Sequence, residues 1–314
     1  MLSAALAAGV VAACAWAATV GLLWWQQDRM IFPGWGYALV QASGVEQPDE
    51  RLTLTTPDGV RLSGALRRAG GQSRGLLLVF GGNAEDPDWR LQHFDGWVRG
   101  LDIVTVFYRG FGPSAGVPSE AALVADATLI HDAMVARLGP RKVVAAGFSL
   151  GSGVAAQLAR QRPLDGLILV TAFDSLEAVA AARYPYVPVA HLLRHPFRSD
   201  EALAGLRVPV AVIGAEADQV VPPASTRRLV EGLAMPVLVR WVPNADHVSI
   251  YDRAEYREAF VEALDRLLGP TPGDPPAPVH GHAPDASPQV RVIDSPPSTS
   301  IAVPETKLAS SDAK

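Results

Sequence analysis

The sequence is poor in cysteine and in charge. Its single cysteine, Cys14, excludes an intrachain disulfide. Charged residues make up 19% of the chain, the net charge is −5, and lysine and arginine form no cluster, so we expect no nucleic-acid partner. Apolar residues make up 49%, which suffices for a large core and also indicates a membrane segment.

The charge is missing most clearly near the N-terminus, where no charged residue occurs between Ala4 and Trp25. As a helix, these roughly 22 residues would extend about 33 Å, enough to cross a hydrocarbon core of about 30 Å. Trp24 and Trp25 end the run with the amphipathic indole rings that favour a membrane interface. We therefore predict a single-pass membrane anchor over residues 1–28.

Other interpretations of this run are open but less favoured. A cleaved signal peptide normally has Lys or Arg before its apolar core, and here none is present. The same lack, and the apolar residues that continue past Cys14, disfavour the lipoprotein cleavage box that residues 11–14 loosely resemble. A buried helix of a globular domain is another alternative, but apolar residues on all faces fit lipid better than they fit an amphipathic surface helix. Arg29 is the basic side chain nearest the run, so basic residues do not orient it across the membrane.

The other end of the chain has a different composition. From about Pro270, proline, serine, aspartate and alanine dominate and no hydrophobic periodicity remains, which predicts a disordered tail over residues 269–314. His280 and His282 in this tail lack a third ligand, so we expect no metal site there.

Residues 45–268 alternate short β-branched runs with helical patterns. Pro57-Asp58-Gly59 is a turn signal that predicts a hairpin of the strands 51–56 and 60–68. Solid apolar runs after it suit a parallel sheet covered on both faces, so we predict one doubly wound α/β domain. The later strands are expected at 76–80, 103–108, 142–146, 167–171, 210–213 and 237–242, and the helices at 89–99, 119–138, 152–160, 223–232 and 253–267. In such sheets, ligands bind at the carboxyl ends of the strands.

A Gly-x-Ser-x-Gly motif follows one of these strands. Ser149 lies at its centre, in Gly147–Gly151, directly before a predicted helix. A serine on such a sharp turn is held above the sheet, and the crowded backbone requires small residues two positions to either side. We predict that Ser149 is a nucleophile. An ordinary glycine-rich turn is the alternative, and Ser152 is disfavoured because it falls inside the helix.

A serine hydroxyl needs a histidine to accept its proton at neutral pH. Of the seven histidines, His247 follows the last predicted strand and precedes the final helix, so we predict it as the base. We expect His93 and His131, which fall in helical patterns, at the surface. His191 and His195 lie in an irregular stretch that would cover the site.

A carboxylate should hold the imidazole of this base in its useful tautomer. Asp218 follows the strand 210–213 and lies one helix and one strand before His247, so we predict it as the acid. Asp174, after the preceding strand, and Asp246, beside the histidine, are alternatives. The alternative at Asp246 is disfavoured because neighbouring side chains seldom point at one another in the required way.

Two glycines follow the strand 76–80, in Phe80-Gly81-Gly82-Asn83. They allow a backbone amide to turn toward a tetrahedral oxyanion, together with the amide after the nucleophile. We therefore predict an oxyanion hole made by the backbone N–H groups of Asn83 and Leu150. A tight turn without a ligand is the alternative.

With these residues together, the chain resembles the membrane-anchored branch of the α/β hydrolases that includes the Bem46 and ABHD13-like proteins. The resemblance covers roughly residues 1–268, and the stretches that carry it are Met30–Pro33, Phe80–Ala84, Tyr108–Ser114, the turn at Ser149 and Asp218–Pro222. It implies the α/β-hydrolase fold and hydrolysis of ester, thioester or amide bonds without a metal or an organic cofactor. It also matches Ser149, Asp218 and His247 to a catalytic triad.

The chain departs from this branch beside the predicted oxyanion hole. The family usually has histidine where Gly81 stands, and Gly-Asn where Glu85-Asp86 stands. We expect the extra acidity to lie at the mouth of the site and to disfavour anionic substrates. Tyr108–Ser114 is interpreted as a structural loop, without a catalytic role for Arg109.

These residues predict a carboxylesterase-like serine hydrolase that cleaves acyl ester or thioester bonds through an acyl-enzyme intermediate. A serine peptidase or amidase of the prolyl-oligopeptidase type is an alternative, disfavoured because no separate propeller domain is present. A catalytically silent scaffold that binds a partner is another, disfavoured by the complete set of catalytic residue types.

The expected partners are the membrane, through the N-terminal helix, and a small-molecule or lipid-like acyl substrate. Residues 178–199 are too few for a large cap domain. Tyr184 and Tyr186 in this segment would line an apolar acyl pocket, although aromatic packing under a loop is an equal alternative. We therefore expect short- or medium-chain acyl esters, or lipid-like acyl groups reached from the bilayer.

Overall fold

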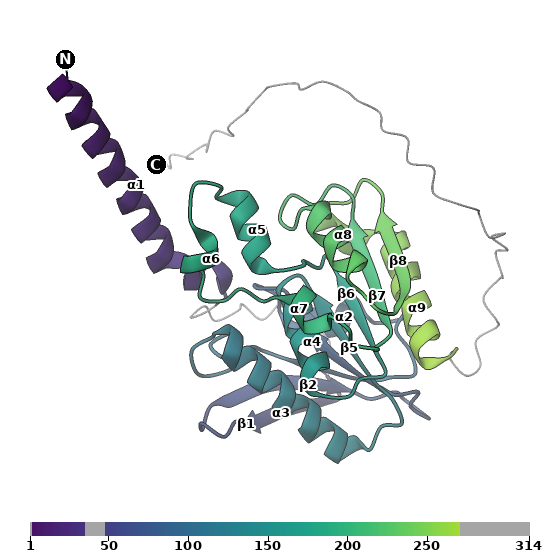
Figure 1. The fold of residues 1–314 in the computed structure, drawn as a ribbon. Coiled ribbons are helices and arrows are strands. Elements are labelled where there is room, and N and C mark those ends of the chain that lie inside the picture. Colours follow the sequence, from purple (N-terminus) through teal and green to yellow (C-terminus); the bar gives the residue numbers. More distant parts are fainter. Residues whose placement is uncertain (1, 35–47, 271–314) are drawn as a thin grey trace, which may run out of the picture. The chain divides into compact units, whose positions relative to one another are not determined.

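The computed structural model describes residues 2–34 and 48–270, and these belong to one compact unit (Figure 1). The tail predicted over residues 269–314 lies, apart from its first two residues, outside the described residues.

The described residues form one eight-stranded sheet with the strand order β1-β2-β4-β3-β5-β6-β7-β8. β1 and β2 form the predicted antiparallel hairpin, β2 pairs antiparallel with β4, and all later pairs are parallel. The prediction of a hairpin followed by a parallel sheet is thus confirmed. The strands are β1 Glu50–Thr55, β2 Arg61–Arg67, β3 Leu76–Phe80, β4 Asp102–Val106, β5 Val143–Phe148, β6 Gly166–Val170, β7 Val210–Ala215 and β8 Pro236–Val242.

Helices cover both faces of this sheet (Figure 1). In β3, Leu76, Leu78 and Phe80 pack into one core cluster, whereas Leu77 and Val79 pack into the other, as the two-residue period of a strand requires. Because both faces of β3 are buried, its sequence is a continuous apolar run. The first cluster contains side chains of α3 Glu120–Leu138, α4 Leu150–Gln161 and α8 Pro223–Glu231, and the second those of α2 Pro87–His93 and α9 Ala254–Leu268.

The N-terminal helix α1 runs from Leu2 to Ile31. Its stretch Ala5–Ile31 is long and apolar enough to cross a membrane. Directly after the helix, the side chain of Phe32 is completely buried in the first core cluster. The end of the apolar helix is therefore fixed to the core of the α/β domain.

Two predicted segments differ from the structure. The helix expected at 89–99 begins earlier, because Asp86 caps it and Pro87 suits its first turn, and it ends at His93 before a turn in which Gly96 has a φ of 81°. The stretch expected to be irregular contains short helices, of which α5 starts at the capping residue Ser175. They are α5 Leu176–Arg183, α6 Val189–Leu192 and α7 Ser199–Leu203, and we call residues 175–198 the cap.

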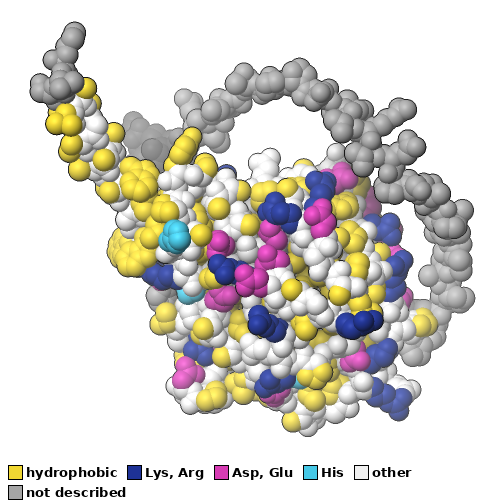
Figure 2. Space-filling model, viewed as in Figure 1, with side chains coloured by type: hydrophobic (Ala, Val, Ile, Leu, Met, Phe, Trp, Pro, Cys, Tyr) yellow, Lys and Arg dark blue, Asp and Glu magenta, His cyan; other side chains and the backbone are white. Residues whose placement is uncertain are grey.

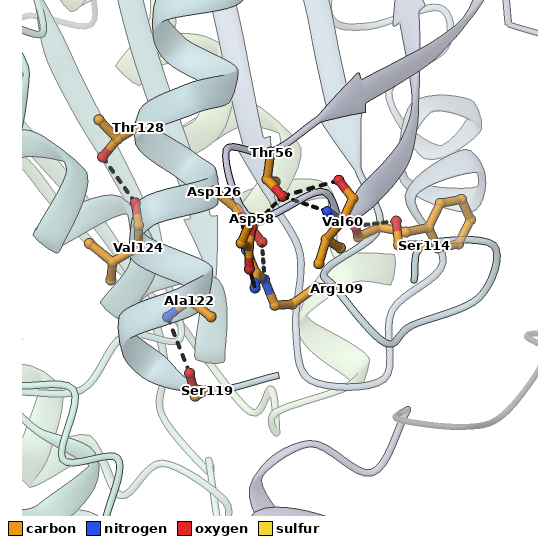
Figure 3. A network of polar contacts seen from close by, with 11 residues as sticks. Thr56, Asp58, Val60, Arg109, Ser114, Ser119, Ala122, Val124, Asp126 and Thr128 are labelled. Carbon is orange, nitrogen blue, oxygen red and sulfur yellow. Dashed lines mark hydrogen bonds and ion pairs between the residues drawn. The ribbon is translucent and has the colours of Figure 1, made fainter. Parts of the chain in front are cut away.

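The loop after β4 is structural, as we expected. The guanidinium of Arg109 donates to both carboxylate oxygens of Asp126 on α3, at 2.7 and 2.5 Å, and to Asp58 in the hairpin turn at 2.9 Å (Figure 3). The Ser114 hydroxyl donates to the Phe107 carbonyl at 2.8 Å. Arg109 thus links the hairpin turn to α3 through charge-assisted hydrogen bonds, and the two carboxylates neutralise the charge of the guanidinium.

Candidate active site

Ser149 lies on the turn between β5 and α4. Its backbone has φ 50° and ψ −115°, a conformation that residues other than glycine rarely adopt. Its amide donates to the Val170 carbonyl at 3.0 Å, which fixes the turn against β6. A Cβ at Gly151 would overlap the Phe80 carbonyl oxygen, and one at Gly147 would overlap the backbone of Gly151. The predicted need for small residues on both sides of Ser149 is therefore confirmed, and the strain holds the hydroxyl above the sheet.

Three predicted side chains meet at the carboxyl edge of the sheet. His247 Nε2 lies 2.9 Å from Ser149 Oγ, and His247 Nδ1 lies 2.7 Å from Asp218 Oδ2. The other carboxylate oxygen of Asp218 accepts from the amides of Val220 and Val221, both at 2.8 Å. This carboxylate favours the tautomer with the proton on Nδ1, which leaves Nε2 free to accept the serine proton.

The alternative acids are bound elsewhere. Asp174 accepts hydrogen bonds from the Ser225 hydroxyl and, at 2.6 Å, from Arg228 Nε. Asp246 accepts from the amide of Ser249 at 2.8 Å, and such backbone bonds hold the pKa of Asp246 below its usual value. Neither carboxylate is therefore oriented toward His247 by its own contacts.

Two histidines lie deeper than we expected. His131 is only 5% exposed, and His93 is enclosed by aromatic rings, with Trp89 stacked at 5.1 Å. Burial, together with the positive charge of Arg90, lowers the pKa of His93 to about 4. His93 ends the seven-residue helix α2, which is too short for a periodic pattern to show its buried face, whereas His131 lies on the buried face of α3 beside Ala127, Ile130 and Met134.

The loop after β3 lies beside Ser149 and is held by two side chains. The Tyr108 hydroxyl donates to the Gly81 carbonyl at 2.8 Å, and the Gly82 amide donates to Glu85 Oε2 at 3.1 Å. The Glu85 carboxylate accepts from Arg90 Nε and Nη2 at 2.5 and 2.7 Å. Our expectation that Glu85 adds acidity at the mouth is therefore wrong, because its charge is neutralised by a buried arginine.

Sequence reasoning did not single out Arg90, the centre of this arrangement. Its side chain is 1% exposed, and its guanidinium carbon lies 3.9 Å from the ring centre of Phe148 and 4.6 Å from that of Tyr251. These aromatic faces and Glu85 compensate for the burial of the cation. Asp86 also has a local role, because its carboxylate accepts from the Asp88 amide and caps α2.

A cavity of about 680 Å³ opens beside the serine, a size typical of small-molecule sites. Asn83, Ser149 and Leu150 line its base. Tyr184 lines it, as expected, whereas Tyr186 is not among the lining residues and its side chain is 85% exposed. The remaining lining residues are almost all apolar and come from the cap, from the loops after β6 and β7 and from α1.

No protein-family model matches this chain. An uncharacterized protein of Mycobacterium tuberculosis is 36% identical over 232 residues, which cover 72% of this chain and 82% of that protein. An uncharacterized membrane protein of Saccharomyces cerevisiae is 31% identical, over 68% of this chain and 79% of that protein. The lysophosphatidylserine lipase ABHD12 of Danio rerio is 35% identical, over 48% of this chain and 45% of the lipase.

Solved structures share the fold at lower identity. A Pyrococcus furiosus esterase superposes with a TM-score of 0.59 at 16% identity, over 75% of this chain and 97% of the esterase. A Xanthomonas campestris α/β serine hydrolase without a lid gives a TM-score of 0.55 at 20% identity, over 72% of this chain and 98% of that hydrolase. The chain therefore belongs to the α/β-hydrolase superfamily, where its relatives include a Bem46-like membrane protein of yeast.

Proposed function

We propose that this protein is a serine hydrolase that cleaves acyl ester or thioester bonds. The observation that carries the proposal is the hydrogen-bonded series Asp218–His247–Ser149, with links of 2.7 and 2.9 Å, at the base of an apolar cavity. Relatives that are named as esterases and lipases support it.

In the proposed reaction, His247 Nε2 takes the Ser149 proton as Ser149 Oγ attacks the acyl carbonyl carbon. Asp218 stabilises the imidazolium that forms. We assign the oxyanion to the backbone amides of Asn83 and Leu150; the latter is the first residue of α4, where an amide has no partner within the helix. His247 then protonates the leaving alcohol or thiol, and water releases the acyl group by the same route.

We propose an acyl chain as the occupant of the cavity. Its lining is mostly apolar, with Leu176, Val179 and Leu192 in the cap. A hydrocarbon chain would be transferred from water to an apolar surface at a gain of about 0.8 kcal/mol per buried CH₂ group. The lipase among the relatives supports a lipid-like substrate.

We also propose that α1 is an uncleaved, single-pass membrane anchor. The yeast relative is named as a membrane protein, and α1 has the required length and hydropathy. The burial of Phe32 and the contribution of α1 to the cavity support retention of the helix, because cleavage would open the site to water.

Hydrolysis of p-nitrophenyl acetate by the purified full-length protein tests the reaction. We expect Ser149→Ala to abolish turnover above background, and Ser152→Ala, three residues farther along and inside α4, to retain it. Full activity of Ser149→Ala would refute the assignment of the nucleophile. Folded wild-type protein without activity on any acyl ester would favour the silent scaffold instead.

A further inference from the structure

One wall of the cavity beside Ser149 is formed by α1, the helix that we assign to the membrane. The α1 side chains that line it recur at spacings of three and four residues, so they share one face of the helix. They are Val20, Leu23, Trp24, Gln27, Met30 and Ile31. The apolar cavity is thus shared between the α/β domain and its proposed anchor.

Polar contacts hold this face of α1 against the cap. Gln27 is only 7% exposed; its side chain donates to the Leu192 carbonyl at 3.2 Å and accepts from the Arg194 amide at 2.8 Å. The Arg194 guanidinium pairs with Asp28 at 2.5 Å and lies 4.4 Å from the ring centre of Trp24. Because buried polar groups are costly to leave unpaired, these bonds favour a fixed position of the cap on α1.

A second contact lies farther toward the N-terminus of α1. The Trp16 indole N–H donates to the Tyr186 carbonyl at 2.9 Å. Trp16 and Gln27 are separated by about 16 Å along the helix axis, given a rise of about 1.5 Å per residue. The cap therefore lies along α1 over this distance, and Figure 1 shows α6 beside the C-terminal end of α1.

This contact places the tip of the cap, around Tyr186, beside the apolar part of α1. If Trp24 and Trp25 lie at the membrane interface, Trp16 is about 12 Å farther into the hydrocarbon. Residues 184–190 of the cap carry no charge, and Tyr186 is highly exposed. In Figure 2, hydrophobic side chains cover α1 and continue onto the adjoining surface. A surface of this kind suits lipid better than water.

We infer that the cap tip enters the same leaflet as the C-terminal half of α1, and that the acyl chain of a bilayer lipid enters the cavity sideways between them. The chain would lie against Leu23 on one side and Val179 on the other, with its ester carbonyl at Ser149. Arg183, the charged exception among the described residues that line the cavity, is exposed, and its long side chain would have to extend toward the headgroup region. This inference rests on the proposed function.

Two neighbouring leucines provide a matched test. Leu23 lines the cavity, whereas Leu22 is 52% exposed on the other side of α1. In full-length protein reconstituted in phosphatidylcholine vesicles, we expect Leu23→Trp to lower kcat/KM for p-nitrophenyl palmitate at least tenfold. Turnover of p-nitrophenyl acetate should change less than twofold, because its acyl group ends at the serine.

Leu22→Trp should leave both activities within twofold of wild type. Equal effects of the two substitutions on the palmitate ester would overturn the inference. If Leu23→Trp also lowers acetate turnover, Val20→Phe and its exposed control Val10→Phe repeat the comparison with a smaller change in volume.

A second readout does not require turnover. Ser149→Ala protein is placed in vesicles of phosphatidylcholine that carries a photoactivatable diazirine on one acyl chain. We expect crosslinks on the peptides that contain Leu23 and Val179. Crosslinks confined to the exposed positions of α1 would contradict entry of the chain, even if the esterase activity were confirmed. Crosslinks at both sites, together with wild-type protein that hydrolyses no acyl ester, would instead refute the proposed function.

Discussion

The carboxyl edge of the sheet and the cap are held in place by different kinds of contacts. At the edge, Ser149 is fixed by backbone hydrogen bonding and by glycines that allow no side chain, and Asp218 is fixed by two amides. In the cap, α5 has no buried residue, and the contacts with α1 come mainly from a few side chains. Changes at the edge should therefore affect every substrate, whereas changes in the cap should select among substrates.

The largest effect is expected at the edge. Asp218→Asn keeps the shape of the side chain but no longer favours the required tautomer of His247, so we expect kcat to fall by about 10³–10⁴ for short and long acyl esters alike. Asp174→Asn, which disturbs a carboxylate bound to Arg228, should lower stability and leave kcat within threefold. Steady-state kinetics with both esters provides the measurement, and a larger loss in Asp174→Asn would reverse the assignment of the acid.

Glu85→Gln should affect stability and turnover together. The change leaves the buried Arg90 without its neutralising charge, and we expect it to lower the free energy of unfolding by about 3–5 kcal/mol. It also weakens the acceptor for the Gly82 amide, so turnover of all esters should fall.

Glu262→Gln is the matched control, because Glu262 pairs with Arg240 and Arg266 at the surface and should contribute about 1 kcal/mol or less. Thermal unfolding and acetate turnover are measured for both variants. Equal stability losses would show that Glu85 has no special role in holding the loop after β3.

A change in the cap should lower the turnover of long acyl esters more than that of short ones. Tyr186→Glu places a charge on the surface that we assign to the bilayer, and we expect turnover of vesicle-borne palmitate ester to fall by about tenfold, or roughly 1.4 kcal/mol. Acetate turnover should remain within twofold. Val117→Glu adds the same charge at another exposed apolar position and should change neither activity. Equal losses in both variants would remove the distinction between the cap and the rest of the surface.

A further effect concerns the pH dependence of stability. The pKa of His93 is lowered from 6.5 to about 4, so between these values the unfolded chain binds more protons than the folded one. Stability should therefore rise with pH over this window and be lost as the pH falls from about 6.5 to about 4. His93→Phe should flatten this dependence, measured as Tm against pH, whereas replacement of the exposed His191 by Phe should not.

The sheet edge was largely predictable because each of its residues directly follows a strand. Strand, Gly-x-Ser-x-Gly and helix form a local signal, and a parallel sheet brings Asp218 and His247 to neighbouring positions after β7 and β8. The Glu85–Arg90 pair was not predictable, since its significance depends on the burial of Arg90 against Phe148 on another element.

The wall formed by α1 could not be predicted for a similar reason. The helix is apolar on all sides, so its composition does not reveal which face carries Leu23 and Gln27 toward the cap. The expectation for Tyr186 failed because an aromatic residue in a short loop can point into a pocket or away from it with the same local sequence.

The central claim is that the imidazole of His247 activates one particular serine. Treatment of the full-length protein with a fluorophosphonate probe at neutral pH, followed by mass spectrometry of its peptides, tests this directly. We predict a single adduct on the peptide that contains Ser149, and none after His247→Ala. An adduct on another serine, or equal labelling of the His247→Ala protein, would contradict the account.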